Sequence, residues 1–284
     1  MAVIFLGGTE MSGNRRYPFV MCMLLSAPST LLLATSQLTP AVAADHTNLE
    51  EGLPVKVEDA FPIEYGKSEV QGVFVYDHFT RKGGQNFFTV EPRLALGLFP
   101  GFQATFRAPY EFSSDGSNSG TASMGGLYQL NQGGQVMPTF ALSGGLDIPY
   151  GSNPTGVETS LKLIAQKGLG SKSENRDLHL NIEWRHNYDP RPDERSDRYG
   201  IGVAYAQPFN ANTLLIASLG GEQELEKGSN KVLLEFGMRH QVSKELVASA
   251  GFGLFRVTGP AEVQSDGFRF VVGFQRSLDS SEPK

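Results

Sequence analysis

The sequence is poor in cysteine, in positive charge and in long apolar runs. Its 284 residues contain one cysteine, and 24 lysines and arginines stand against 30 aspartates and glutamates. This charge balance argues against a nucleic-acid partner, because such a partner is held by basic side chains on its phosphates. Beyond residue 44 no apolar run approaches the ~18 residues that a membrane-spanning helix needs, which excludes a helical transporter.

Glycine and phenylalanine, by contrast, are abundant, with 33 and 19 residues. Glycine at this level exceeds the usual ~7 % of soluble domains. A hydrophobic fraction of 40 % argues against an intrinsically disordered chain. Composition alone therefore leaves two classes open, a soluble β protein and a membrane β-barrel.

Residues 1–44 have the organisation of an export signal. Two arginines follow Met11, which is a more ordinary start for such a signal than the first residue. An uncharged, mostly apolar stretch covers residues 17–34, and small residues end the segment at 41–44. We predict a signal peptide over residues 1–44, cleaved after Ala43 or Ala44. A single membrane anchor is the alternative interpretation.

Apolar and polar residues alternate along most of the remaining chain. The clearest stretch runs from Leu178 to Arg185. One face carries Leu178, Leu180, Ile182 and Trp184, and the other carries His179, Asn181, Glu183 and Arg185. This period of two is typical of a strand between two different environments. If the polar face lines a lumen, the apolar face points outward to lipid.

Twelve such runs account for nearly all of the chain after residue 68. They cover residues 69–77, 85–98, 102–111, 121–130, 136–148, 158–167, 176–188, 198–207, 213–222, 230–241, 246–257 and 266–278. Their lengths suit the ~9–11 residues of a tilted bilayer-spanning strand better than the ~5–6 of a soluble one. Longer polar connections alternate, imperfectly, with shorter ones. We therefore predict an all-β fold, an antiparallel up-and-down transmembrane β-barrel of about 12 strands.

The predicted organisation has four parts. They are a signal peptide at 1–44, a periplasmic N-terminal segment at 45–68, an outer-membrane β-barrel at 69–278 and a C-terminal tail at 279–284. A β-sandwich or a lipocalin-like barrel is the soluble alternative, and it predicts shorter strands with fewer charges. The sequence leaves open whether the N-terminal segment plugs the barrel.

Several stretches resemble a family of outer-membrane barrels, the MetA-pathway of phenol degradation family. The similar residues are Glu58-Asp59-Ala60-Phe61-Pro62-Ile63-Glu64-Tyr65-Gly66, Val90-Glu91-Pro92-Arg93-Leu94, Gly97-Leu98-Phe99-Pro100-Gly101, Tyr128-Gln129-Leu130-Asn131 and Asp177-Leu178-His179-Leu180-Asn181. The similarity covers about residues 49–278. It implies an outer-membrane β-barrel transporter of small solutes, hydrophobic or aromatic compounds among them.

Charged residues on the polar faces of the predicted strands are the candidate lumen lining. They are Glu91, Arg93, Arg107, Lys162, Glu183, Arg185, Lys231, Glu235, Arg239 and Arg269. One interpretation is a charged constriction that selects permeants. The other is that opposite charges on neighbouring strands pair with each other and stiffen the wall. Both can hold at once.

The sequence predicts no catalytic residue, no metal site and no cofactor. His179 and His186 are seven residues apart on one strand, so their side chains point to opposite faces and share no metal. The single cysteine, Cys22, would leave with the signal peptide. The loop 189–198 carries mixed charges that suit divalent cations or lipopolysaccharide phosphates, and a solvated loop is the alternative.

The predicted function is a porin-like outer-membrane channel or transporter for small solutes. The expected partners are outer-membrane lipid and lipopolysaccharide, the barrel-assembly machinery and a small-molecule permeant, with no nucleic acid. Two alternatives stay open. One is a structural or adhesin-type barrel, and the other is a lipid-acting enzyme that uses His186 or His240 with a serine on a neighbouring strand.

Overall fold

The computed structural model describes residues 44–80, 84–134, 136–151, 156–169, 176–260 and 264–278 of the chain. The predicted signal peptide up to residue 43 and the predicted tail at 279–284 lie outside the described residues. All described residues belong to one unit, Pro40–Lys284. None of them forms a helix with the length and apolar character that spanning a bilayer requires.

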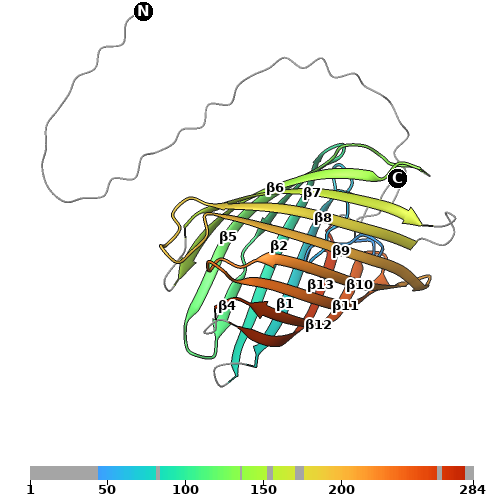
Figure 1. Ribbon diagram of the computed structural model, residues 1–284. Coiled ribbons are helices and arrows are strands. Elements are labelled where there is room, and N and C mark those ends of the chain that lie inside the picture. The colour runs from blue at the N-terminus through green and yellow to red at the C-terminus, as the bar shows by residue number, and fades with distance from the viewer. Residues whose placement is uncertain are drawn as a thin grey trace, which may run out of the picture. The chain divides into compact units, whose positions relative to one another are not determined.

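Thirteen strands in these ranges form one antiparallel sheet (Figure 1). They are β1 (Ser68–Phe79), β2 (Gln85–Phe99), β3 (Phe102–Arg107), β4 (Tyr110–Ser113), β5 (Asn118–Gln129), β6 (Thr139–Gly151), β7 (Glu158–Leu169), β8 (Arg176–Asn187), β9 (Asp197–Asn210), β10 (Thr213–Gln223), β11 (Asn230–Ser243), β12 (Leu246–Thr258) and β13 (Ser265–Ser277).

The sheet closes on itself, because β1 pairs with β2 on one side and with β13 on the other. Strands β3 and β4 lie end to end between β2 and β5 and pair with both of them, so the barrel has twelve positions around its circumference. Closure leaves no unpaired edge, which is what a sheet surrounded by lipid requires. The prediction of an antiparallel barrel of about 12 strands is confirmed.

One predicted strand, 102–111, is interrupted at Ala108 and Pro109. Proline has no N–H to donate, which is why the ladder breaks there. The backbone N–H of Ala108 donates to the carbonyl of Pro92 at 3.1 Å, and that of Thr121 donates to the carbonyl of Pro109 at 3.0 Å. These two bonds keep β3 and β4 in line despite the break.

The connections follow the predicted alternation with one clear exception. Residues 100–101, 211–212 and 244–245 are two-residue turns, whereas residues 188–196 form a long connection at the other end of the barrel. The connection at 130–138 is longer than the short turn predicted at 131–135. Gly101 has a φ of +77°, a conformation that favours glycine and permits the tight turn into β3.

The outer surface of the barrel is apolar. Ile182 on β8 is 47 % exposed, and Val232 and Phe236 on β11 are 50 % and 53 % exposed. Aromatic side chains with high exposure lie near both rims, such as Phe209 beside a short turn and Tyr188 in a long connection. An apolar band between aromatic rims is typical of barrels in outer membranes.

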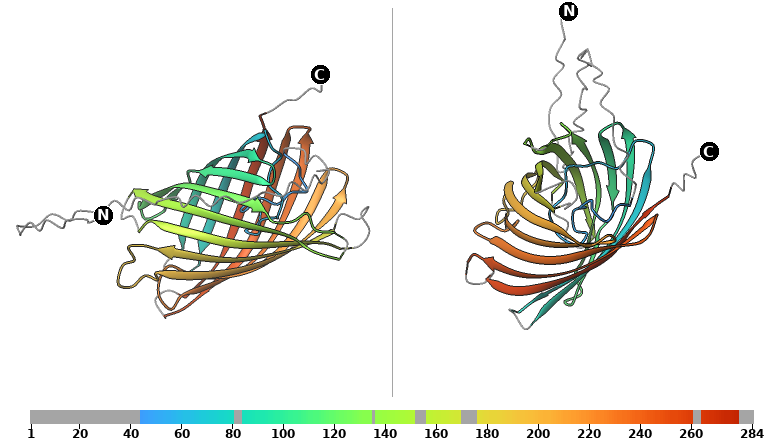
Figure 2. Two further views of the ribbon diagram at one scale, coloured as in Figure 1. Left: turned by 90° about the horizontal axis from the view of Figure 1, so that it is seen from above. Right: turned by 90° about the vertical axis from the view of Figure 1, so that its right-hand side faces the viewer.

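Residues 44–67 are named the inner segment below; residues 44–64 lie inside the barrel, and residues 65–67, with Tyr65 and Gly66 exposed, lead to β1. Figure 2 shows this segment, in blue, within the ring of strands. Its Leu49, Leu53, Val55 and Ala60 are at most 1 % exposed. The sequence left open whether the predicted N-terminal segment at 45–68 plugs the barrel, and in the structure its buried side chains pack against the inner wall. The segment lies there because burying its apolar side chains against the wall is favourable. It has no period-two pattern and forms no strand of the sheet.

Candidate functional site

Arg239 of β11 holds both ends of a loop in the inner segment. Its guanidinium donates to the carbonyl oxygens of Asp45 at 3.1 Å, His46 at 3.1 Å and Leu53 at 2.8 Å, and also to the side chain of Gln275. The Arg239 side chain is wholly buried. A guanidinium with several donors in one plane suits this role, because it satisfies several buried carbonyls at once.

Amide side chains of the strands satisfy the backbone of the inner segment. Asn181 of β8 accepts from the N–H of Glu58 and donates to its carbonyl, both at 2.8 Å. Gln103 of β3 accepts from the N–H of Ile63 at 2.8 Å, and Gln166 of β7 accepts from the N–H of Ala60 at 3.2 Å. Buried backbone groups need partners, and here the wall supplies them in place of a sheet ladder.

Apolar contacts and glycines fit the segment to the wall. Leu49, Val55 and Val57 form a cluster with side chains of β9 and β10. A Cβ added at Gly237 would lie 2.2 Å from Cγ of Pro54, so glycine is required for this close approach. The inner segment is therefore packed against a complementary surface of the barrel.

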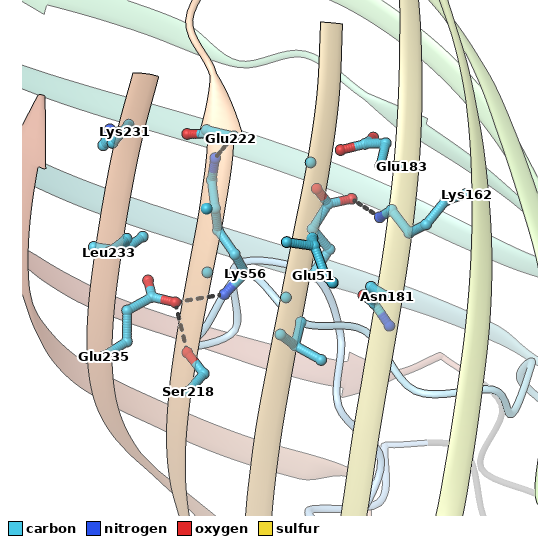
Figure 3. Close-up of a pocket in the computed structure, with 16 residues that line it drawn as sticks. Glu51, Lys56, Lys162, Asn181, Glu183, Ser218, Glu222, Lys231, Leu233 and Glu235 are labelled. Atoms are coloured by element: carbon cyan, nitrogen blue, oxygen red, sulfur yellow. Dashed lines mark hydrogen bonds and ion pairs between the residues drawn. The ribbon is translucent and has the colours of Figure 1, made fainter. Parts of the chain in front are cut away.

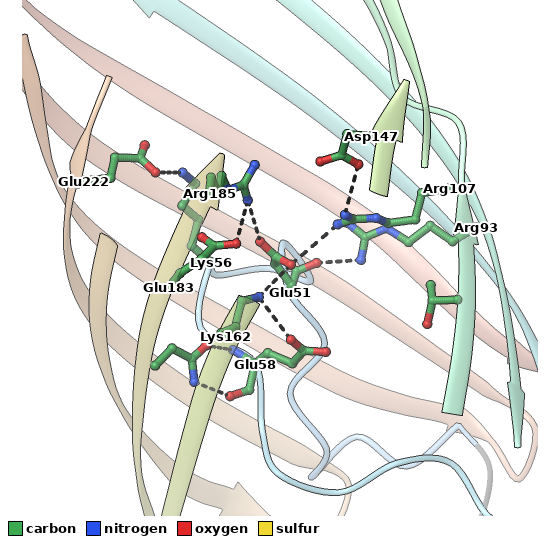
Figure 4. Close-up of polar contacts among 12 residues, drawn as sticks. Glu51, Lys56, Glu58, Arg93, Arg107, Asp147, Lys162, Glu183, Arg185 and Glu222 are labelled. Carbon is green, nitrogen blue, oxygen red and sulfur yellow. Dashed lines mark hydrogen bonds and ion pairs between the residues drawn. The ribbon is translucent and has the colours of Figure 1, made fainter. Parts of the chain in front are cut away.

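Glu51 is the centre of the charged contacts (Figure 4). Its carboxylate lies 2.9 Å from Nζ of Lys162 on β7, 3.5 Å from Nη1 of Arg107 on β3 and 3.8 Å from Nη2 of Arg185 on β8. Burial by itself raises the pKa of Glu51, but these three cations hold that pKa well below its ordinary value. Three wall positions thus converge on one carboxylate of the inner segment.

All ten sequence-predicted lining residues face the interior of the barrel. Glu91 pairs with Arg93 at 2.8 Å, Glu183 with Arg185 at 3.0 Å and Arg269 with Asp77 at 2.7 Å, so part of the charge is paired within the wall. Glu235 accepts from the hydroxyl of Ser218 at 2.9 Å, and Lys231 lies 4.7 Å from the ring centre of Phe255. Six of the ten also contact the inner segment, namely Arg93, Arg107, Lys162, Arg185, Glu235 and Arg239.

Several residues of the site were not predicted from the sequence. Glu51 and Glu58 supply the two carboxylates at Lys162, and Asp147 of β6 lies 3.9 Å from Arg107. Lys56 pairs with Glu222 of β10, and its N–H donates to Glu235 at 2.9 Å (Figure 3). The excess of acidic over basic residues between positions 45 and 67 was the available signal, since it complements the basic side chains of the strands.

The predicted separation of the two histidines of β8 matches the structure. His179 is wholly buried on the inner face, whereas His186 lies on the outer face, stacked on Trp184 and with Nδ1 3.0 Å from Oδ1 of Asp197. In the described part of the chain no group of three or more His, Cys, Asp or Glu residues could hold a metal ion. These contacts therefore assign no catalytic or metal chemistry to either histidine.

Little free space remains inside the barrel next to the inner segment. Two cavities of about 50 Å³ each border Glu51 and Lys162, one of them also lined by Lys56, Glu222 and Glu235 (Figure 3). A larger cavity of about 400 Å³ lies toward the long connections, where Phe79, Phe87, Leu225 and Val257 contribute to its lining. A pocket for a drug-sized ligand has about 300–1,000 Å³. The two small cavities are below this range, whereas the larger cavity and a neighbouring pocket of about 470 Å³ beside Arg256 and Asp266 reach it.

Two of the long connections contact each other next to the larger cavity. The N–H of Arg195 donates to the carbonyl of Leu225 at 2.7 Å, and that of Lys227 donates to the carbonyl of Asp193 at 2.8 Å. In the first of these connections Arg191 pairs with Glu194 at 2.6 Å. Some of the mixed charge in the loop 189–198 is thus used inside the loop itself.

Solved structures with the same fold include three outer-membrane barrels. The COG4313 outer membrane channel from Pseudomonas putida F1 is 13 % identical, with a TM-score of 0.59, and the match covers 81 % of this chain and 100 % of that chain. The NanC porin is 8 % identical, with a TM-score of 0.53 and coverage of 74 % and 100 %. The beta domain of the Bordetella autotransporter Brka is 13 % identical, with a TM-score of 0.51 and coverage of 76 % and 100 %.

At these identities the likeness establishes the barrel fold. No family model and no curated relative matches the sequence, so the resemblance to the MetA-pathway family stays an expectation from the sequence.

Proposed function

We propose that this protein is an outer-membrane channel for small solutes and that its inner segment closes the channel in the conformation described. The observation that carries the proposal is the position of residues 44–67 among inward side chains from around the barrel. The cavities of about 50 Å³ beside Glu51 hold a few water molecules and no larger solute. Transport then requires the inner segment to move.

The exterior supports a location in the outer membrane. Side chains such as Ile182, Phe236 and Leu254 expose about half of their surface around the barrel. Large contiguous apolar surfaces are rare on soluble monomers, whereas lipid makes them favourable. A closed barrel also satisfies its backbone without water.

Aromatic side chains on one part of the larger cavity support hydrophobic or aromatic solutes as part of the permeant range, while the rest of its lining is polar and includes Arg191, Asp193, Glu194, Glu224 and Glu226. Phe79 and Phe87 are in edge contact at 5.4 Å between ring centres, and Phe79 lies 4.8 Å from Phe255. Aromatic rings pack well in such tilted and edge arrangements. The resemblance to the MetA-pathway family points the same way.

A contact at the start of the inner segment supports export with cleavage after Ala43. The backbone N–H of Ala44 donates to Oε1 of Glu69, and both residues are buried. Cleavage after Ala43 would turn this N–H into an ammonium group facing a carboxylate, which strengthens the contact. N-terminal sequencing of the mature protein is expected to start at Ala44, and a start at any other residue would contradict this cleavage site.

Two alternative functions have less support. A lipid-acting enzyme needs a serine beside His186 or His240. Among the described contacts, His186 is bonded to Asp197, and Nδ1 of His240 lies 2.9 Å from the hydroxyl of Thr213. A structural or adhesin-type barrel gives no reason for a segment that fits the lumen so closely.

Planar-bilayer conductance of the purified full-length mature protein tests the proposal. We expect discrete, reversible openings above a closed baseline, and release of benzyl alcohol from proteoliposomes faster than from protein-free vesicles. A folded, inserted barrel that never opens and never speeds release would favour the structural alternative.

A further inference from the structure

Lys162 differs from the other cations of the wall in the source of its partners. Among the ion pairs of the described residues, it has two, with Glu51 at 2.9 Å and Glu58 at 3.1 Å, and both belong to the inner segment. Its side chain is only 7 % exposed. When the inner segment moves out of the lumen, the ammonium of Lys162 loses both carboxylates and faces the opened lumen.

The two arginines beside Lys162 keep wall partners when the inner segment leaves. Arg185 stays 3.0 Å from Glu183, and Arg107 stays within 3.9 Å of Glu91 and Asp147. Including Arg93, four cations then face three carboxylates in this part of the wall. The group thus carries one positive charge in excess. Glu183 lies directly opposite Lys162 in the register, but its carboxylate is paired with Arg185 at 3.0 Å.

The wall beside Lys162 also offers a cavity and hydrogen-bond donors to a small ligand. The cavity next to Glu51 and Lys162 is lined by Ser143 and Ser160, together with glycines of β5 and β6. Gly125 and Gly145 are directly opposite each other in the register of these strands. Departure of the Glu51 side chain would add its own volume to this space.

We propose that Lys162, with Arg107 and Arg185, forms a binding site for the carboxylate of a small organic acid, and that Glu51 occupies this site while the channel is closed. The permeant's carboxylate and Glu51 compete for the same cations, so the permeant itself favours the open channel. This inference rests on the proposed channel function and specifies the chemistry of one class of permeant.

Titration of the purified full-length protein with benzoate, followed by calorimetry, tests the site. We expect Glu51→Gln to bind benzoate at least tenfold more tightly than the unmodified protein, because its competitor has lost its charge. Lys162→Met is expected to lose binding at least tenfold, and Lys162→Arg to keep it. The matched control is Lys244→Met, at an exposed lysine in the turn between β11 and β12, which should bind as the unmodified protein does. Benzyl alcohol, which has the same ring without the carboxylate, should not compete.

The result that overturns the site is equal benzoate affinity in the unmodified protein, Glu51→Gln and Lys162→Met, or equal binding of benzyl alcohol. If Lys162→Met fails to fold in a heat-modifiability gel, the comparison of Glu51→Gln with the unmodified protein decides alone. Ionic conductance without any benzoate competition would refute the site and leave the channel proposal standing. Benzoate binding in a barrel that never conducts would refute the channel and leave the site standing.

Discussion

Nη1 of Arg239 donates a hydrogen bond of 2.8 Å to the carbonyl oxygen of Leu53, so a strand near the C-terminus holds the backbone of a segment 186 residues earlier. The same guanidinium also reaches the carbonyls of Asp45 and His46. Because the donors are charged and buried, each bond contributes about 1.5–3 kcal/mol. Arg239 is therefore the main anchor of the inner segment.

Replacing Arg239 by methionine is expected to loosen the inner segment while the barrel stays folded. Amide hydrogens of residues 44–67 should exchange at least tenfold faster in hydrogen–deuterium exchange measured by mass spectrometry. The matched control is Arg256→Met, because the pair of Arg256 with Asp266 is mostly exposed and such pairs contribute about 0–1 kcal/mol. Equal exchange in both variants would contradict the anchoring role.

The closed state is expected to weaken as pH rises toward neutrality. Burial, together with the charges of Glu69 and Glu58, raises the pKa of Glu50 from 4.5 to about 7, while Arg239 and Arg93 act in the opposite sense. Between pH 4.5 and 7, Glu50 is therefore protonated when the inner segment is docked in the barrel and ionised when the segment is released. Its docking is favoured at the lower pH and loses this contribution above pH 7.

Bilayer conductance measured between pH 5 and pH 8 tests this dependence, with an expected increase in open probability toward pH 8. Glu50→Gln should reduce the dependence, because it removes one of two carboxyls of the inner segment whose pKa is raised. Burial and the charge of Glu50 raise the pKa of the other, Asp59, well above its ordinary value, so Asp59 acts in the same direction. Glu51, whose pKa is lowered, acts in the opposite direction only below pH 4.5 and does not interfere. Open probability that falls from pH 5 to pH 8 would show that Glu50 does not control docking.

Two substitutions on β8 test which face of the strand meets lipid. Ile182→Arg places a charge on the outer face at a cost of about 2–4 kcal/mol near the bilayer midplane, so assembly should be impaired in a heat-modifiability gel. Arg185→Glu faces the interior and should insert normally, while the reversal potential shifts toward cation selectivity. Ile182→Phe is the matched control for the outer position. Normal insertion of Ile182→Arg together with failure of Arg185→Glu would invert the assignment.

Local patterns predicted the strands because each barrel strand separates two environments. The alternation from Leu178 to Arg185 is sufficient to place Ile182 outside and Glu183 inside, and the observed contacts agree. The break in the strand at Ala108 came from Pro109, which was visible in the sequence but stood within an otherwise regular alternation. A period-two pattern indicates the environment on each face of a strand. It does not indicate whether the backbone hydrogen bonds to the neighbouring strands continue without a break.

The contacts of the inner segment could not be predicted in the same way. Lys162 and Glu51 are 111 residues apart, and nothing in the local pattern of either indicates the other. The segment has no period of two, because its backbone is bonded to side chains such as Asn181 and Gln103 rather than to a neighbouring strand. The strand residues Arg107, Lys162 and Arg185 of these ion pairs were therefore predictable and their partner Glu51 was not, and neither residue of the pair between Lys56 and Glu222 was predicted.

The most direct test of the closed channel is a disulfide between the inner segment and the wall. A Cβ added at Gly202 would lie 2.9 Å from Cγ2 of Val57, a separation close enough for a bridge between cysteines. The single native cysteine, Cys22, precedes the described residues. In planar bilayers, oxidised Val57→Cys/Gly202→Cys is predicted to conduct at least tenfold less than the Val57→Cys single variant, and a reductant should restore its openings. Equal conductance of the oxidised and reduced double variant would contradict the account, because solutes would then pass without movement of the inner segment.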